Sequence, residues 1–386
     1  MNICIISTSY PNEDGVGNTF VEQLVNAMTR QGHRCVVISP LNTFGNNNVS
    51  KYKEHEVKEI GHNLKVEVYR PRIWNRNIPL VPVSTNLHLA QRAIEKTIKK
   101  HKLEFDVMYC HFFASGVLAW HHAFNNNIPL FVATGESKIK PLLQKPCFGF
   151  SLKKFREYTS GVVCVSSKNL DECVELGYAE REKCKVFPNG ANLQLFKPLD
   201  KKKCRQQIGL KEEDFLLITV GEFSDRKGQN RIIKAVDSLS DPTIKTCFIG
   251  SGEPIANRDY VFYKGRISHD ELPIYLNAAD VFVLPTLSEG CCNAIVEALA
   301  CGLPVVSSDR KFNYDILDES NSIMVDPEDV NQIAAVIKLL HEDNNKRENL
   351  AVGASNKAMS LSIDQRASNI LSFIKEKTFI DGYEHH

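Results

Sequence analysis

Strand-like runs of β-branched and aliphatic residues alternate with amphipathic stretches of helical period along almost the whole chain. The alternation occurs twice, once on each side of a turn-rich segment at residues 187–192. The strand-like runs are continuously apolar, which is typical of parallel sheets covered by helices on both faces. We therefore predict an α/β protein with two Rossmann-like, doubly wound domains that face each other across a cleft.

The two halves contain comparable sets of elements. In the first half, the predicted strands are 2–8, 34–39, 106–110, 128–134 and 161–165, and the predicted helices are 19–30, 87–100, 115–125 and 168–176. In the second half, the strands are 215–220, 246–249, 261–263, 280–284, 304–308 and 322–325, and the helices are 229–239, 270–279, 293–300, 330–341 and 363–377.

These elements define the expected domain organisation. We expect an N-terminal domain at 1–195, onto which a C-terminal helix at 363–380 packs back, and a C-terminal domain at 196–362. The last residues, 384–386, resemble part of a purification tag.

The composition excludes several classes of protein. The 386 residues contain 47 Lys and Arg against 46 Asp and Glu, and this net charge of +1 argues against a polybasic nucleic-acid binder. The apolar runs have the length of strands rather than of membrane spans, and the N-terminus lacks the basic leader of a signal peptide. Twelve scattered cysteines without a C-x-x-C pair favour reduced core thiols. We expect a cytoplasmic protein with no metal and no other cofactor.

The loops that follow the strands should carry the chemistry, because open parallel sheets bind ligands at the carboxyl ends of their strands. In the first such loop, Gly15 and Gly17 precede a helix, where free N–H groups and the helix dipole favour a phosphate. The loop is not a dinucleotide fingerprint, because Phe20 stands at the third glycine position. A flexible turn explains the two glycines equally well.

Two glutamates flank a second candidate phosphate site. Glu289 lies in the loop after a predicted strand, and Glu297 lies about one turn into the following helix. Their carboxylates could accept hydrogen bonds from sugar hydroxyls, while small residues near the helix N-terminus let a diphosphate approach. These residues are Gly290, Cys292, Asn293 and Ala294. The alternative is a solvated pair of surface carboxylates.

Three further candidates follow strands or end them. Arg226 and Lys227 open a helix and could neutralise a diphosphate leaving group, or they belong to an ordinary solvated loop. His111 ends a strand of the first half, where its side chain could make polar contacts to a ligand in the cleft. The alternative is a histidine with a purely structural role. The carboxylate of Glu136 is a further candidate at the same edge. No Asp-x-Asp, P-loop, G-x-S-x-G or H-E-x-x-H motif occurs.

Several segments together carry a resemblance to a known family. Glu289 and Glu297 form an E-x7-E motif, and Glu-Ala-Leu-Ala-Cys-Gly-Leu-Pro-Val-Val follows at 297–306. The further similar segments are 188–190, 250–252, 265–267 and 279–285, with Phe196 and Pro198. With these motifs, the chain resembles the retaining glycosyltransferases of family 4, which have the GT-B fold. The resemblance extends along nearly the whole chain.

The resemblance implies that the C-terminal domain binds a nucleotide-diphosphate sugar. Glu297 matches the glutamate that bonds the ribose, and Glu289 matches the one near the hydroxyls of the donor sugar. Lys227 matches the lysine that binds the diphosphate. The backbone at Arg266 and Ile267 would face the base.

The resemblance also assigns residues of the first half and shows one departure. Gly17 would approach the diphosphate, and His111 matches a histidine that touches the donor sugar. The family commonly has Arg where this chain has Glu222, which puts one diphosphate contact in doubt. Either Arg226 compensates for the missing cation, or the acid selects a different donor or acceptor geometry.

The implied reaction is transfer of a sugar to a hydroxyl of a glycan or lipid-linked acceptor in polysaccharide or glycoconjugate assembly, with retained configuration. No carboxylate is an obvious covalent nucleophile, so we favour front-face attack with the leaving diphosphate as proton acceptor. Stabilisation of that leaving group would then be the main catalytic contribution. The alternatives are a sugar-nucleotide epimerase, a glycan phosphorylase, or an inactive binding subunit of the same fold.

The near-zero net charge of the whole chain conceals an uneven distribution of charge between its two halves. Residues 1–195 carry 24 Lys and Arg against 17 Asp and Glu, which leaves 23 basic and 29 acidic residues for the remainder. Much of the excess lies at 51–102. Solvated surface is one interpretation of this excess. The other is an acceptor-binding domain that faces an anionic membrane, at its inner face.

Overall fold

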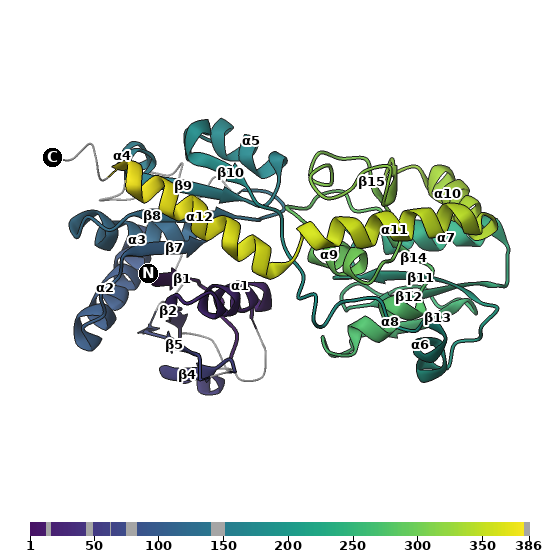
Figure 1. Ribbon diagram of the computed structural model, residues 1–386, viewed down its shortest axis with the longest axis horizontal. Coiled ribbons are helices and arrows are strands. Elements are labelled where there is room, and N and C mark those ends of the chain that lie inside the picture. Colours follow the sequence, from purple (N-terminus) through teal and green to yellow (C-terminus); the bar gives the residue numbers. More distant parts are fainter. Residues whose placement is uncertain (13–16, 44–48, 62, 75–82, 140–150, 382–386) are drawn as a thin grey trace. The chain divides into compact units, whose positions relative to one another are not determined.

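The protein is described here by a computed structural model that covers residues 1–12, 17–43, 49–61, 63–74, 83–139 and 151–381 (Figure 1). The chain divides into two compact units. The first unit consists of Met1–Phe187 and Arg366–His386, and the second of Pro188–Gln365. The main segment of the first unit ends at Phe187, the first residue of the turn-rich segment.

The first unit is built on an eight-stranded sheet with the order β10-β9-β8-β7-β1-β2-β5-β4. Its strands are β1 (Asn2–Ile6), β2 (Arg34–Ile38), β4 (His55–Glu59), β5 (Lys65–Tyr69), β7 (Val107–His111), β8 (Leu130–Thr134), β9 (Thr159–Cys164) and β10 (Cys184–Val186). All neighbours pair in parallel except β4, which runs antiparallel to β5. A small parallel pair, β3 (Leu41–Asn42) and β6 (Arg72–Ile73), lies beside this sheet.

The expectation of purely parallel sheets is wrong at this edge. The segment His55–Glu59 contains one apolar residue, Val57, which is exposed, and its only buried residue is Glu56. Such a strand needs cover on one face only, as in antiparallel sheets, and its charged residues suit an edge.

Helices cover both faces of the first sheet. They are α1 (Thr19–Arg30), α2 (Val83–His101), α3 (Phe113–Asn125), α4 (Leu152–Tyr158), α5 (Ser167–Glu175) and α12 (Ile363–Asp381), with short 3-10 turns η1 (Val49–Lys51) and η2 (Arg181–Lys183). One core joins alternate strand residues to α2, α3, α4 and α5. On α12, Phe373 packs against Phe131 and Phe187, and a Cβ at Gly161 would lie 2.9 Å from its ring, so glycine is needed there.

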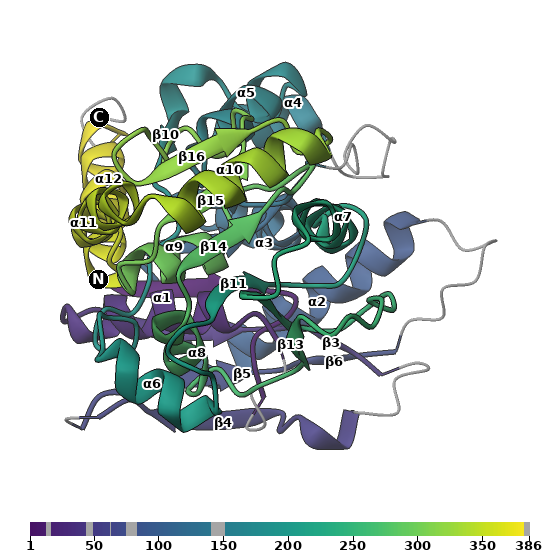
Figure 2. The ribbon, with the colours of Figure 1, turned by 90° about the vertical axis from the view of Figure 1, so that its right-hand side faces the viewer.

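The second unit has a six-stranded, fully parallel sheet with the order β13-β12-β11-β14-β15-β16. Its strands are β11 (Phe215–Val220), β12 (Ile244–Ile249), β13 (Val261–Gly265), β14 (Val281–Leu284), β15 (Val305–Ser308) and β16 (Ser322–Val325). Its helices are α6 (Lys201–Ile208), α7 (Gln229–Leu239), α8 (Leu272–Ala278), α9 (Asn293–Ala300), α10 (Val330–Glu342) and α11 (Asn344–Ser360). One core joins α7 and α10 to the sheet, and α9 packs against α11 on the other face (Figure 2).

Each sheet reverses its direction of growth once. In the first unit the chain order changes between β1 and β7, and in the second unit between β11 and β14. Doubly wound sheets bind ligands at such switch points, beyond the carboxyl ends of the strands. Both units thus have the doubly wound α/β architecture that the sequence predicts. Among the described residues, no helix is long and apolar enough to cross a membrane.

Candidate functional site

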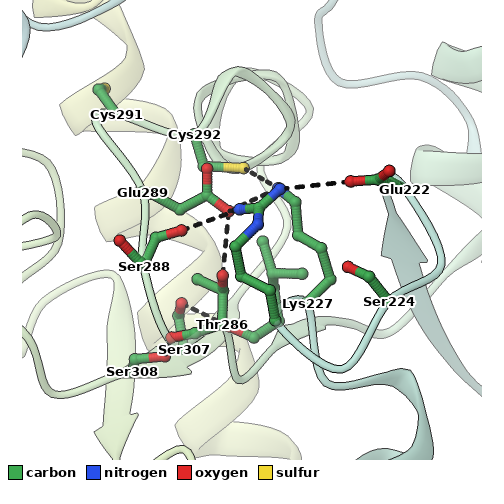
Figure 3. A network of polar contacts seen from close by, with 12 residues as sticks. Glu222, Ser224, Lys227, Thr286, Ser288, Glu289, Cys291, Cys292, Ser307 and Ser308 are labelled. Carbon is green, nitrogen blue, oxygen red and sulfur yellow. Dashed lines mark hydrogen bonds and ion pairs between the residues drawn. The ribbon is translucent and has the colours of Figure 1, made fainter. Parts of the chain in front are cut away.

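A group of charged side chains lies at the switch point of the second unit (Figure 3). Arg226 and Lys227 follow β11, and Glu289 follows β14, the neighbouring strand. The loops bring Glu289 into contact with Arg226 and Lys227, although it lies more than 60 residues after them in the sequence. The sequence predicted all three as site residues, and the fold places them in one cluster.

Glu289 is the centre of this cluster. Its Oε1 accepts hydrogen bonds from Arg226 at 2.7 Å and from the Thr286 hydroxyl at 3.0 Å, and it pairs with Lys227 Nζ at 2.7 Å. Its Oε2 makes no hydrogen bond to any residue that the structure describes. The first oxygen therefore orders the two cations, and the second is available to a ligand hydroxyl.

Lys227 is held as a buried cation. It is only 8% exposed. Burial by itself lowers the pKa of Lys227, but the negative charges of Cys292, once its thiol ionises at high pH, and of the Glu289 carboxylate outweigh this effect, so the pKa is raised above its ordinary value. The Lys227 ammonium consequently stays charged at neutral pH, as a contact to a diphosphate requires.

The turn that carries these cations needs a glycine. Gly228 has φ of +85°, and a Cβ there would lie 2.6 Å from the carbonyl oxygen of Pro285. Only glycine satisfies both conditions without displacing the β14 loop. This close approach sets the β11 loop against the β14 loop, and the backbone of Leu287 then donates to Arg226 O at 2.8 Å.

The N-terminus of α9 lies beside the cluster. The Lys227 ammonium is 3.9 Å from the Sγ atom of Cys292, the residue that precedes α9. Burial raises the pKa of the Cys292 thiol, so it remains neutral despite the nearby lysine. Asn293 and Ala294, half-buried, open the helix, and Gly290 is buried before it. Their position would allow helix N–H groups and Lys227 to act on one anion.

Glu297 lies on α9, and a histidine that the sequence did not indicate contacts it. The His269 ring is 3.3 Å from Glu297 Oε1, and this hydrogen bond raises the pKa of His269. Arg266 and Ile267 follow β13, where the Arg266 side chain donates to Ser251 at 2.8 Å and its carbonyl accepts from Tyr263 at 2.9 Å. These contacts fix the loop whose backbone is predicted to face the base.

Glu222, the departure from the family pattern, points toward the same cluster. Its carboxylate is 65% exposed and lies 3.6 Å from Arg226. Arg226 also donates to the carbonyl of Ser288 at 2.9 Å. Arg226 therefore lies between two acids, the exposed Glu222 and the buried Glu289.

The first unit contributes a second group of predicted residues. His111 ends β7 at the switch point, is 4% exposed, and neither ring nitrogen has a hydrogen-bond partner among the described residues. Burial and then the charge of Arg366 lower its pKa to about 3, so the ring is neutral. Glu136 lies after β8, and its Oε2 accepts from Thr134 at 2.7 Å and from the Gly135 amide at 3.0 Å.

The glycine loop of the first unit is partly described. Gly17 has φ of +143°, and a Cβ there would lie 2.8 Å from Pro11 Cα, so the chain folds back on itself before α1. The Asn18 amide donates to the Ser9 carbonyl at 2.8 Å and closes this turn. Gly15 lies outside the described residues.

Sequence reasoning missed three residues of these groups. Thr286, Ser288 and His269 support Glu289, Arg226 and Glu297. Thr286 and Ser288 lie within three residues of Glu289 and follow β14, and this position could have identified them as site residues. Nothing in the sequence around His269 indicates its contact with Glu297. Among the described residues, no three His, Cys, Asp or Glu side chains group together as a metal site would require.

Comparison with known proteins identifies the family. The model of glycosyl transferases group 1 matches residues 200–357, and the model of glycosyltransferase family 4 matches residues 17–195. The chain belongs to the family 4 glycosyltransferases. It is therefore an enzyme that uses nucleotide sugars, and the resemblance inferred from the E-x7-E motif is confirmed.

Bacterial glycosyltransferases are among the relatives of this chain. TuaC of Bacillus subtilis (strain 168), assigned as a teichuronic acid biosynthesis glycosyltransferase, is 27% identical over 89% of this chain and 90% of its own length. The UDP-Gal:α-D-GlcNAc-diphosphoundecaprenol α-1,3-galactosyltransferase of Escherichia coli is 26% identical over 69% of this chain and 73% of its own.

Solved structures show the GT-B fold. The sucrose-phosphate synthase of Thermosynechococcus elongatus matches with a TM-score of 0.75 and 19% identity, covering 97% of this chain and 98% of its own. HepE of Anabaena, in complex with UDP and glucose, matches with a TM-score of 0.70 and 20% identity, covering 96% of this chain and 99% of its own.

Proposed function

We propose that this glycosyltransferase moves a sugar from a nucleotide-diphosphate sugar to a hydroxyl of a glycan or lipid-linked acceptor, with retention of configuration. The observation that carries the proposal is the cluster of Lys227, Arg226 and Glu289 at the switch point beside the N-terminus of α9. A buried lysine that stays charged beside a helix N-terminus suits a diphosphate.

In this proposal each side chain has a distinct role. Lys227 and Arg226 neutralise the charge that develops on the leaving diphosphate, which is the main catalytic contribution. Glu289 orders both cations through Oε1 and offers Oε2 to the hydroxyls of the donor sugar. Glu297 accepts from the ribose, the backbone at Arg266 and Ile267 faces the base, and the amides at 290–294 bind the diphosphate.

The first unit is proposed to bind the acceptor. His111 contacts the donor sugar as a neutral imidazole, because its low pKa keeps it uncharged. Gly17, with Gly15, approaches the diphosphate, and Glu136 supplies a carboxylate at the same edge. The acceptor hydroxyl attacks from the leaving-group side, and its proton passes to the leaving diphosphate.

The donor and acceptor classes follow from the relatives. A UDP-sugar donor is supported by the UDP-galactose enzyme of Escherichia coli and by the UDP-bound HepE structure. A lipid-linked sugar diphosphate is supported as acceptor by the same Escherichia coli relative. We propose a role in capsule, teichuronic acid or similar polysaccharide assembly.

The test is turnover on a panel of nucleotide sugars with and without a lipid-linked GlcNAc diphosphate. We expect release of a nucleoside diphosphate together with an acceptor heavier by one glycosyl unit, both by mass spectrometry. An epimerase would instead convert the donor without acceptor, a phosphorylase would require inorganic phosphate, and an inactive subunit would bind the nucleotide without turnover. Any of these outcomes contradicts the proposal.

We further propose that the first unit meets an anionic membrane from the cytoplasmic side. Four exposed basic residues on α2, near its C-terminal end, support this: Arg92, Lys96, Lys99 and Lys100. Each basic residue adds about 1 kcal/mol of attraction near such a surface. Binding to phosphatidylglycerol vesicles should weaken as salt rises and in the quadruple alanine variant. Binding that does not change with salt concentration or with lipid charge would refute this membrane proposal.

A further inference from the structure

The first unit contains a cavity that the donor-binding residues do not use. Its volume is about 460 Å³, within the usual range for small-molecule sites. It lies beyond the carboxyl ends of β1, β2 and β5, at the same sheet edge as His111 on the neighbouring β7. Polar residues of its lining are Thr8, Ser9, Ser39, Asn42, Tyr52 and Arg70. Open α/β sheets bind ligands at this edge, so the position is that of a substrate pocket.

The lining is of two chemical kinds. Besides the hydroxyls, the amide and the guanidinium, the lining contains the apolar side chains of Leu41, Ile73, Ala90 and Leu118. A pyranose ring matches this combination, because it presents hydroxyls around its edge and C–H groups on its faces.

The cavity rests on a group of four charged side chains, of which Arg70 and Glu56 are buried and Lys58 and Glu22 are partly buried. Arg70, 1% exposed, donates to Glu56 at 2.9 Å and to the Pro11 carbonyl at 2.7 Å. Lys58 pairs with Glu22 at 2.6 Å and also donates to the Pro11 carbonyl, at 3.1 Å. Two cations and two carboxylates are thus paired, and together they hold the loop after β1 that forms one wall.

This pairing restricts what the cavity accepts. The group of four charged side chains has no net formal charge, and an added anion would be a third negative charge facing only two cations. A neutral ligand can instead hydrogen-bond to the hydroxyls and the amide of the lining without disturbing this balance.

From these observations we propose that the cavity binds a neutral sugar residue of the acceptor and disfavours a uronate or phosphate in the same place. The proposal rests on the proposed function, since the first unit is there the acceptor-binding unit. It deepens that function by naming where the acceptor sugar sits and which chemical class of sugar is selected.

The experiment is saturation-transfer NMR on the full chain in the presence of UDP. The probes are methyl α-glucopyranoside and methyl N-acetyl-α-glucosaminide, with methyl α-glucuronide as the anionic counterpart. Ala90→Leu fills the cavity from α2, and Ala93→Leu, one turn along the same helix and outside the lining, is the matched control. A second variant, Ser9→Ala, removes one hydroxyl of the lining without adding volume.

We expect the neutral glycosides to bind the wild type and Ala93→Leu, and Ala90→Leu to weaken them at least tenfold. Ser9→Ala should weaken them about fivefold, and Glu56→Gln, which leaves one cation unpaired, should admit the glucuronide. The proposal is overturned if no neutral glycoside binds, if the glucuronide binds the wild type better, or if Ala90→Leu and Ala93→Leu behave alike. Release of UDP from UDP-sugars, measured with the same variants in separate samples that contain the donor, reports independently on the proposed function.

Discussion

His111 provides the prediction that can be worked out most fully from the structure. The ring is buried, its two nitrogens lack hydrogen-bond partners among the described residues, and its pKa is lowered to about 3. In the unfolded chain the pKa of a histidine is about 6.5. The folded-state value is the lower one, so the stability that this residue contributes is present above pH 6.5 and is lost as the pH falls toward 3.

The expected size follows from the two pKa values. Each pH unit below 6.5 costs about 1.4 kcal/mol, because the unfolded chain binds a proton that the folded chain excludes. Between pH 7 and pH 5 the free energy of unfolding should therefore fall by about 2 kcal/mol through His111 alone. His111→Phe keeps a ring of similar shape, and it should remove this part of the pH dependence.

The assay is urea unfolding at pH 5, 6 and 7, followed by tryptophan fluorescence. Both tryptophans of the chain, Trp74 and Trp120, belong to the first unit, so the signal reports on the unit that contains His111. Phe20→Leu is the matched control, because the Phe20 ring packs against the His111 ring at 5.6 Å without titrating. It should lower stability at every pH and keep the slope. If His111→Phe has the same pH dependence as the wild type, the reasoning is refuted.

Three further predictions concern the donor site and its loops. Glu289→Gln should lower kcat/KM for nucleoside diphosphate release by about 10²-fold, since both cations lose their shared carboxylate; unchanged turnover would contradict this. The pKa of His269, followed by NMR, should lie above 6.5 and fall in Glu297→Gln, and an unchanged value would exclude the hydrogen bond as its cause. Gly17→Ala should raise the donor KM about tenfold, because its Cβ meets backbone atoms. Gly32→Ala, with φ of +84° and open space around it, should cost only about 1 kcal/mol of stability and leave KM unchanged.

Much of the fold can be predicted because its strands are buried on both faces. All six strands of the second unit were predicted within a few residues, since each contains a short run of mainly β-branched or aromatic residues. The strands β4, β5 and β10 were missed, because charged residues interrupt the first two and β10 has only three residues. Three helices were missed as well. The helices α4 and α6 have only seven and eight residues, and few side chains of α11 are buried, so its sequence has little amphipathic period.

The residues of the candidate site could be predicted from the sequence, but the contacts between them could not. Lys227 and Glu289 could be predicted, because they follow strands at the switch point and belong to a family motif. Their direct ion pair could not, since it depends on how two loops meet in space. The charges around Arg70 gave no signal at all, because their positions in the sequence show no spacing that relates them.

The central claim is that Lys227 and its neighbours hold the donor diphosphate, and the most direct measurement is kcat/KM for UDP-sugar turnover in Lys227→Met. Lys201→Met is the matched control, because Lys201 also pairs with a carboxylate, Asp280 at 2.6 Å, but that carboxylate lies at the start of β14 rather than after its end. The account predicts a loss of at least 10²-fold for Lys227→Met, with little change for Lys201→Met. Equal activity of the two folded variants would contradict it.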